Sequence, residues 1–170
     1  MARKVAKDQE KENVREHRGR NIQFAQRFEE YNLGVKDTIT TRKLMNNLNK
    51  TEIGREIVEY IVNHPELRIS MYYGIDNEWE VKGAQEKNEI TLYASETKNV
   101  QETAEVLIHE IIHYRYNTGG SGWAECVCFA QETKHRTRKS KLTGSELRNI
   151  IKSVVELYPE LFHGGIKNEP

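Results

Sequence analysis

The chain has 170 residues, enough for one domain with a substantial buried core. It carries 26 lysines and arginines against 26 aspartates and glutamates, and this zero net charge argues against a protein that binds nucleic acid over its whole surface. No stretch approaches the roughly 20 apolar residues that span a bilayer, and residues 1–20 lack the apolar segment of a secretory signal. We therefore expect a protein that is cytoplasmic or is delivered as part of a larger effector.

The first predicted elements are two helical stretches. Residues 8–32 are rich in charged and amide side chains and become apolar only from Ile22 onward, which predicts a helix with a solvated first half and a docked second half. We assign it to a charged helical arm over residues 1–35, with a linker as the alternative. Residues 40–63 have apolar side chains at helical spacing, with a predicted interruption around 49–54 and an end at His64-Pro65.

The periodicity then changes from helical to alternating. Residues 68–74, 78–82 and 88–95 alternate apolar and polar side chains and are separated by turn residues. They predict three short strands of a small, mostly antiparallel sheet.

Three further helices follow. Asn99 and Glu102 resemble a capping box that opens a helix to about Tyr116, and a glycine-rich turn leads to a helix over residues 123–135. Thr143 and Glu146 predict the start of a last helix that ends at about Tyr158. That helix is expected to supply five core residues: Ile150, Ile151, Val154, Val155 and Leu157.

The sequence His109-Glu-Ile-Ile-His113 lies in the first of these helices and has the pattern H-E-x-x-H. Histidines four residues apart share one helix face, so both imidazoles can bind one zinc ion, while Glu110 is placed to take a proton from water beside that ion. The alternative is a pair of surface or hydrogen-bonded core histidines. The rest of the helix is largely apolar, however, and unpartnered polar groups there would be costly.

A catalytic zinc requires a third protein ligand, and the next helix offers candidates. If the two helices form an antiparallel hairpin, Glu125 lies level with His113, whereas Glu132 falls two turns further, opposite Val106. This geometry favours Glu125 as the third ligand. The alternative is that Glu125 only interacts favourably with the helix dipole.

Two other residues of that helix are fallback ligands. Cys128 lies one turn below Glu125, roughly level with His109, and His135 lies near the far end of the hairpin. Cys126 and Cys128 diverge on the helix, which argues against a disulfide between them and favours reduced thiols.

The pattern of His109 to His113, followed by a helix with Trp123-Ala-Glu125-Cys-Val-Cys-Phe-Ala130, resembles the gluzincin arrangement of zinc peptidases. Within that class, residues 88–135 resemble the small metallopeptidase domains of bacterial polymorphic toxins and prophage proteins, and more distantly the ImmA/IrrE regulatory peptidases. The resemblance implies an α+β, zincin-like domain over residues 36–166, followed by a tail over 167–170. It also implies Zn²⁺ held by His109, His113 and Glu125, with Glu110 as the general base of peptide-bond hydrolysis.

The expected partners follow from this resemblance. A protein or peptide is the expected substrate, and a toxin-type effector would have a neutralising immunity protein. The alternatives are a zinc-stabilised structural or binding module of a phage and a regulatory protease that cleaves a repressor. The basic run over residues 134–141 lacks interleaved aromatic side chains, so we interpret it as a solvated loop rather than a nucleic-acid site.

Several aromatic residues lie near the motif. Tyr93 either packs on the sheet or marks an edge strand that pairs with an extended substrate, and Trp123 is expected to shield the metal from solvent. The sequence does not choose an oxyanion donor among four candidates: Tyr114, Arg115, Tyr116 and His135.

Overall fold

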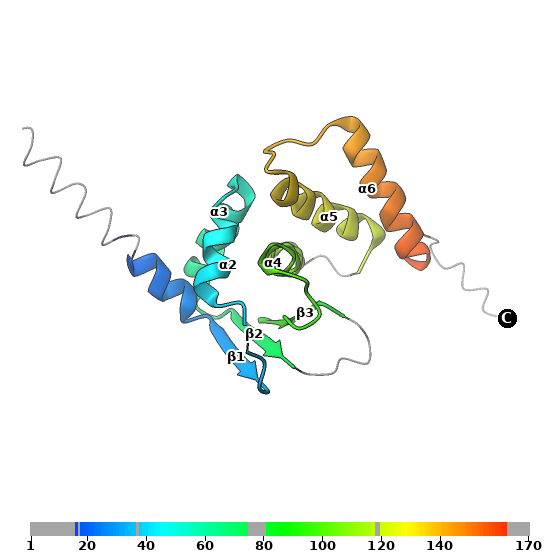
Figure 1. Ribbon diagram of the computed structural model, residues 1–170. Coiled ribbons are helices and arrows are strands. Elements are labelled where there is room, and N and C mark those ends of the chain that lie inside the picture. Colours follow the sequence, from blue (N-terminus) through cyan, green and yellow to red (C-terminus); the bar gives the residue numbers. More distant parts are fainter. Residues whose placement is uncertain (1–15, 17, 37, 75–80, 118–119, 163–170) are drawn as a thin grey trace, which may run out of the picture.

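The chain folds into an α+β domain with helices on one face of a four-stranded mixed sheet (Figure 1). The computed structural model describes residues 16, 18–36, 38–74, 81–117 and 120–162. The strands are β1 (Phe28–Asn32), β2 (Arg68–Tyr73), β3 (Gly83–Glu86) and β4 (Glu89–Tyr93). The helices are α2 (Thr41–Leu48), α3 (Glu52–Asn63), α4 (Val100–Tyr116), α5 (Gly122–Thr137) and α6 (Gly144–Leu157), with a 3₁₀ turn at Pro159–Leu161.

The sheet has the strand order β1-β2-β4-β3. Among the described strands, β1 pairs with β2 in parallel, β2 pairs with β4 in parallel, and β3 pairs with β4 antiparallel. The prediction of a mostly antiparallel sheet is therefore wrong. Side chains alternate between the two faces in both parallel and antiparallel sheets, so the sequence pattern does not give the direction of a strand. The direction depends on the connections, and α2 and α3 form the crossover that makes β1 and β2 parallel.

The strand predictions differ in their outcomes. The strands predicted over 68–74 and 88–95 are confirmed as β2 and β4. Most of the strand predicted over 78–82 lies outside the described residues, and the described strand begins at Gly83. The helix predicted through residue 32 is wrong at its end, because helix is present over 18–25 and residues 28–32 form β1. β1 lies in the sheet although it falls within the predicted arm, and its charged sequence FEEYN hides it because four of its five residues are exposed.

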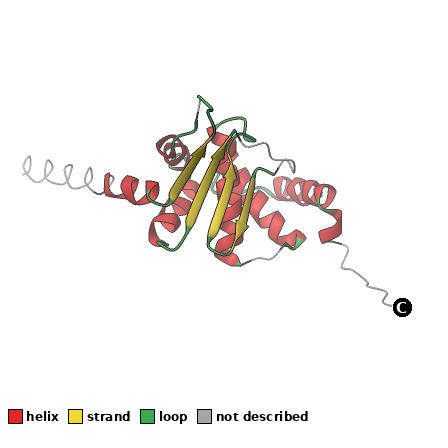
Figure 2. Cartoon of the chain, turned by 90° about the horizontal axis from the view of Figure 1, so that it is seen from below, coloured by secondary structure: helices red, strands yellow, loops and turns green. Residues whose placement is uncertain are grey.

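All described helices lie on the same side of the sheet. Viewed from below, the four strands stand in front of the helices (Figure 2). The uncovered face carries a row of tyrosines, with Tyr31 stacked on Tyr72 at 4.8 Å between ring centroids and Tyr72 stacked on Tyr93 at 5.9 Å. Tyr93 therefore packs on the sheet, and its strand β4 is interior, so the edge strands are β1 and β3.

The main core lies between the sheet and the helices α2, α3 and α4. Its fully buried residues include Leu44, Ile57, Ile69, Leu92 and Ile111, each 0–1% exposed. The predicted interruption between α2 and α3 is confirmed, and a Cβ added to Gly54 would lie 1.9 Å from the carbonyl oxygen of Leu48. Glycine at position 54 therefore permits the tight turn that stacks these helices.

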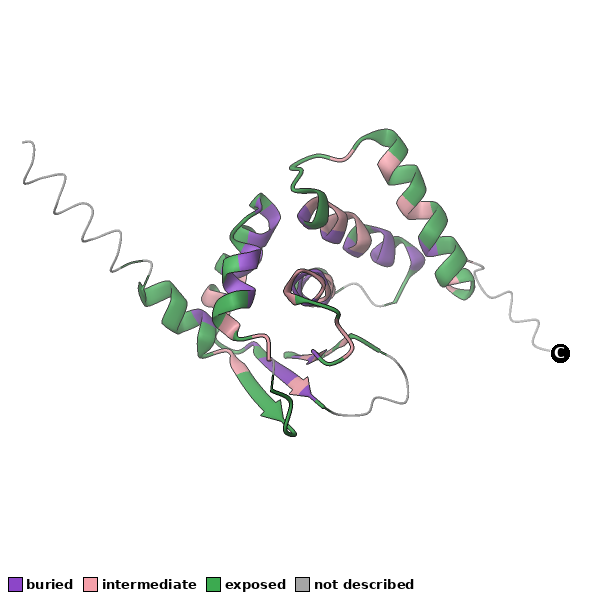
Figure 3. Cartoon of the chain, in the orientation of Figure 1, coloured by how far each residue is buried: buried purple, intermediate pink, exposed green. Residues whose placement is uncertain are grey.

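The last helix contributes less to the core than the sequence predicts. The capping box of Thr143 and Glu146 is present, but of the five expected core residues only Val154 is buried, and Val155 and Leu157 are exposed. Colouring by burial shows that α6 is largely exposed, whereas α4 and α5 are buried where they face each other (Figure 3). α6 therefore packs on α5 through a narrow stripe.

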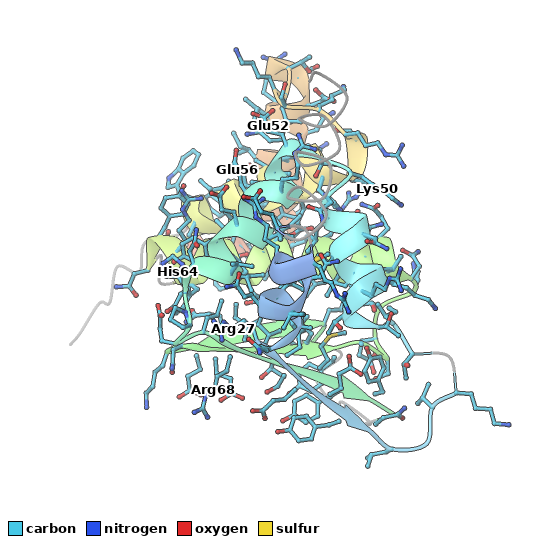
Figure 4. The ribbon with its side chains drawn as sticks, turned by 90° about the vertical axis from the view of Figure 1, so that its left-hand side faces the viewer. Arg27, Lys50, Glu52, Glu56, His64 and Arg68 are labelled. Carbon is cyan, nitrogen blue, oxygen red and sulfur yellow. The ribbon has the colours of Figure 1, made fainter. Side chains whose placement is uncertain are left out.

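The helix ends match their sequence signals. Thr40, Thr51, Asn99 and Ser121 each accept a hydrogen bond from the backbone of the first turn of their helix. The Glu102 carboxylate bonds to the backbone of Lys98 rather than Asn99, so that capping box is only half formed. His64, labelled in Figure 4, caps the end of α3. Within the described ranges, no helix combines the length and the apolar character needed to cross a membrane.

Candidate metal centre

The helix α4 holds both histidines of the motif at the centre of the molecule. Asn99 caps its start, and Asn117 ends it in the left-handed conformation that asparagine tolerates. Its apolar side chains Leu107, Ile108 and Ile111 are buried in the core. His109 and His113 both contact Glu125 of α5, and Figure 1 shows α5 beside α4.

Three electron-pair donors from these two helices converge on one point. The Nε2 atoms of His109 and His113 lie 3.0 Å apart, and each lies 3.2 Å from an oxygen of the Glu125 carboxylate. A tetrahedral zinc site with bonds of about 2.0–2.1 Å has donor–donor edges of about 3.3 Å. The observed separations of 3.0–3.2 Å are close to these edges, so the donor set fits a zinc ion, although a proton on an imidazole would also bridge the same atoms.

The geometry agrees with the hairpin deduced from the sequence. Glu125 lies in the first turn of α5, where Ser121 caps the helix, and it reaches both histidines. Burial alone would raise the pKa of Glu125, but its contacts with His109 and His113 lower it to about 2. The carboxylate is therefore ionised, as a metal ligand must be.

Cys128 lies beside the same two histidines. One donor atom from each of His109, His113 and Cys128 falls within 4.8 Å of the others. The thiol is fully buried, and burial raises its pKa, which disfavours the thiolate that binds metal. Glu125 and Cys128 therefore both lie close to the two histidines, the first as a carboxylate and the second as a buried thiol.

Glu132 contributes in a way that the sequence reasoning missed. It lies outside the triangle of donors, as expected, but its Oε1 is 2.5 Å from Nδ1 of His109. A carboxylate at the second ring nitrogen fixes the tautomer of a metal-binding histidine, leaving Nε2 for the ion. The signal was present, because Glu125 and Glu132 are seven residues apart and share one face of α5.

His109 therefore lies between two carboxylates. Burial by itself would lower the pKa of His109, but its hydrogen bonds to Glu125 and Glu132 outweigh burial and raise the pKa to about 10. Arg136 in turn lies 3.6 Å from Glu132 and donates two hydrogen bonds to Glu105. The surroundings of His109 consequently favour a positive charge on it, whether a proton or a metal ion.

The Glu110 carboxylate lies against the edge strand β3. It is 9% exposed, and burial raises the pKa of its carboxyl. A Cβ added to Gly83 would lie 2.9 Å from Oε1 of Glu110 and 2.5 Å from Cγ1 of Val106. Only glycine therefore allows the strand to approach this carboxylate so closely.

A cavity of about 470 Å³ opens beside His109 and Glu110. Its walls come from Lys82 and Gly83 at β3, from α4, from Phe129 and Arg136 of α5, and from Tyr158. The lysine and the arginine are each paired with a glutamate, Lys82 with Glu102 at 2.7 Å and Arg136 with Glu105 at 2.7 Å. One wall of the cavity thus contains the predicted metal ligand His109 and the predicted base Glu110, and another wall is the edge of the sheet at Gly83.

His135 is not part of this site. It is 1% exposed, and its ring nitrogens lie 2.6 Å from Oγ1 of Thr51 and 2.8 Å from Oδ1 of Asn47. Both nitrogens are therefore engaged in a separate buried network that ties α5 to α2 and α3. The predictions of His135 as a fallback ligand or an oxyanion donor are wrong for that reason.

The other aromatic predictions also change. Tyr114 contacts Glu66, and Arg115 lies over the rings of Tyr60 and Tyr116, so none of the predicted donors after His113 lines the cavity. Trp123 is 66% exposed and lines a different groove, so the prediction that it shields the metal is wrong.

Tyr158 lines the cavity instead, although the sequence reasoning treated it only as a helix end. Burial raises the pKa of its hydroxyl, and the nearby carboxylates of Glu125, Glu132 and Glu110 raise it further. The hydroxyl is therefore protonated at neutral pH and able to donate a hydrogen bond.

The chain was compared with protein-family models, with curated proteins and with solved structures, and no match was found in any of the three.

Proposed function

We propose that this chain is a zinc-dependent peptide hydrolase with a zincin-like fold. The observation that carries the proposal is the convergence of His109, His113 and Glu125, together with a cavity that is lined by His109 and Glu110. Three protein donors leave one position of a tetrahedral zinc ion for water or substrate, which is the ligand count of a catalytic site.

Each residue of the centre has a distinct task. His109, His113 and Glu125 bind the ion, and Glu132 holds His109 in the orientation that presents Nε2. When bound, zinc supplies Lewis-acid polarisation of the scissile carbonyl and of the attacking water. The proposed ligands come from two helices that pack against each other, α4 and α5.

Glu110 acts as the general base. Its burial raises its pKa, which makes the carboxylate a stronger proton acceptor than an exposed glutamate. It takes the proton of the attacking water and delivers it to the amine that leaves when the peptide bond breaks. Tyr158 also lines the cavity, and its protonated hydroxyl is the proposed hydrogen-bond donor to the oxygen of the scissile carbonyl.

The substrate we propose is a protein or peptide in extended conformation. Among the described strands β3 lies at an edge and pairs with β4 alone, and its Gly83 borders the cavity beside Glu110. An extended peptide could add to such an edge by main-chain hydrogen bonds, which would bring a peptide bond close to Glu110.

Metal analysis and cleavage of a peptide library test the proposal together. Purified protein should contain about one zinc ion per chain and should cleave library peptides. Glu110→Gln should keep the zinc and reduce cleavage by about 10²–10⁴-fold, because it removes only the base. Ala84→Ser, on the exposed side of the same edge strand, is the matched control and should change neither quantity. A protein without bound zinc, or a Glu110→Gln variant with full activity, would contradict the proposal.

A zinc-stabilised module without catalysis is the second candidate, and Cys128 is the observation that favours it. If the buried thiol bound as a fourth ligand, the site would be closed, as in structural zinc sites. Cys128→Ser would then lower zinc affinity sharply. In the catalytic case Cys128→Ser keeps the zinc and the activity, so this variant separates the two candidates.

The biological setting belongs to the proposal and rests on the resemblance of the His109–His113 and Glu125 pattern. We infer a bacterial or phage effector, cytoplasmic or delivered within a larger effector, with an immunity protein as partner. A regulatory protease that cleaves a repressor is the alternative. Identification of the cleaved protein by mass spectrometry in cells that express the wild type or Glu110→Gln would decide between them.

A further inference from the structure

A second concave surface lies on the far side of α5 from the metal centre. α5 and α6 enclose a groove of about 550 Å³ whose apolar lining includes Trp123, Val127, Leu147 and Ile151. Trp123 is 66% exposed, Val127 44% and Leu147 42%. Apolar side chains gathered in one groove, rather than scattered singly over a surface, mark a binding surface.

The charge around this groove has one sign. Lys134 and Lys141 are part of its lining, and none of the described residues that line it is acidic. Neither lysine forms an ion pair with another described residue, whereas the neighbouring Lys139 is paired with Glu146 at 2.6 Å. The groove therefore combines an apolar floor with two uncompensated positive charges.

This charge disfavours the occupants that the chain itself could supply. A second copy docked groove to groove would bring the lysines of both copies together. The segment 1–15 carries five basic and three acidic residues, and the segment 163–170 carries one lysine and one glutamate. Neither segment offers the excess of negative charge that the lysines would attract.

We propose that the groove between α5 and α6 binds an acidic amphipathic helix of a partner protein. Such a helix places apolar side chains at positions i, i+3 or i+4, and i+7 into a groove, and its flanking glutamates or aspartates reach the lysines. An exposed tryptophan in the floor is the kind of side chain that dominates binding energy at interfaces. The partner thus binds on the face of α5 opposite to Glu125, without covering the cavity.

A library of displayed amphipathic helices tests this proposal directly. The apolar positions are fixed, and each remaining position is varied among Glu, Lys and Gln. The helices enriched on the full chain should carry an excess of Glu, and synthetic copies should bind more weakly at high salt. Trp123→Ala should weaken their binding at least tenfold. The double variant Lys134→Glu/Lys141→Glu should instead select helices rich in Lys. Zinc content and melting temperature should stay at the wild-type values in both variants.

The proposal would be overturned by no enriched helix, by an enrichment of basic helices on the wild type, by binding unaffected by Trp123→Ala, or by binding of vesicles that contain anionic lipid in preference to any helix. Self-association in sedimentation experiments that Trp123→Ala abolishes would assign the groove to a second copy instead.

Discussion

The two faces of α5 show how differently one helix can be used. Its inner face carries Glu125, Cys128 and Glu132, which are buried and lie close to the histidines of α4. Its outer face carries Trp123 and Val127, which are exposed in the groove shared with α6. Buried carboxylates require partners inside the molecule, and exposed apolar side chains gain stability only from a partner outside it. Substitutions on the inner face should therefore reduce stability or metal binding. Substitutions on the outer face should affect only the binding of a partner.

The largest difference is expected between His113, which faces α5 inside the hairpin, and Trp123 on the outer face of α5. His113→Ala removes one of three donors, so we expect bound zinc to fall from about one per chain to near zero and peptide cleavage to be lost. Trp123→Ser should leave both unchanged. Elemental analysis of dialysed proteins and cleavage assays measure the difference. Retention of zinc by the His113 variant would show that the convergence of donors is not a metal site.

A substitution at Gly83 tests whether the close approach of β3 to Glu110 matters for activity. In Gly83→Ala the new methyl group overlaps Val106 and Oε1 of Glu110, so either β3 or the carboxylate must move. A shift of about 1 Å at a catalytic group can cost on the order of 10²-fold in rate, and we expect a loss of that size with zinc retained. Steady-state kinetics on one peptide substrate, compared with the Ala84→Ser control, measure it. An unchanged rate would mean that Glu110 does not act from its present position.

A substitution at Glu132 tests how much the orientation of His109 contributes to zinc affinity. Glu132→Gln keeps the size of the side chain but replaces the charged partner of Nδ1 in His109 by an amide. We expect zinc affinity to fall by about 10–100-fold, the usual effect of losing such a partner. Competition with a fluorescent chelator measures the affinity. Thr133→Val on the same turn is the control, because Thr133 bonds only to the backbone of Phe129 among the described residues, and its affinity should match the wild type.

The two faces of α5 also show which site residues could be predicted from the sequence. The motif predicted two donor residues, and the predicted helical hairpin put Glu125 level with His113. Both predictions need only local helical geometry. The spacing of Glu125 and Glu132 indicates that they share one face of α5, but the contact of Glu132 with His109 depends on the rotation of α5, and the role of Gly83 depends on the close approach of β3. The parallel pairing of β1 was missed for a related reason: a charged edge strand has no alternation to read, and its direction follows from the crossover through α2 and α3.

The smallest expected effect concerns stability against pH after chelation of metal. The pKa of His109 is raised to about 10 by its two carboxylate partners, so protonated His109 stabilises the fold below its unfolded pKa of about 6.5. That contribution is lost as the pH rises from about 7 to 10. We expect a loss on the order of 1 kcal/mol or more in urea unfolding of chelator-treated protein, and none in His109→Asn. On the outer face, Val127→Ser should show the same pH dependence as the wild type, because Val127 lines the groove shared with α6. A wild-type stability that does not change over this range would mean that the charge of His109 is not balanced by Glu125 and Glu132.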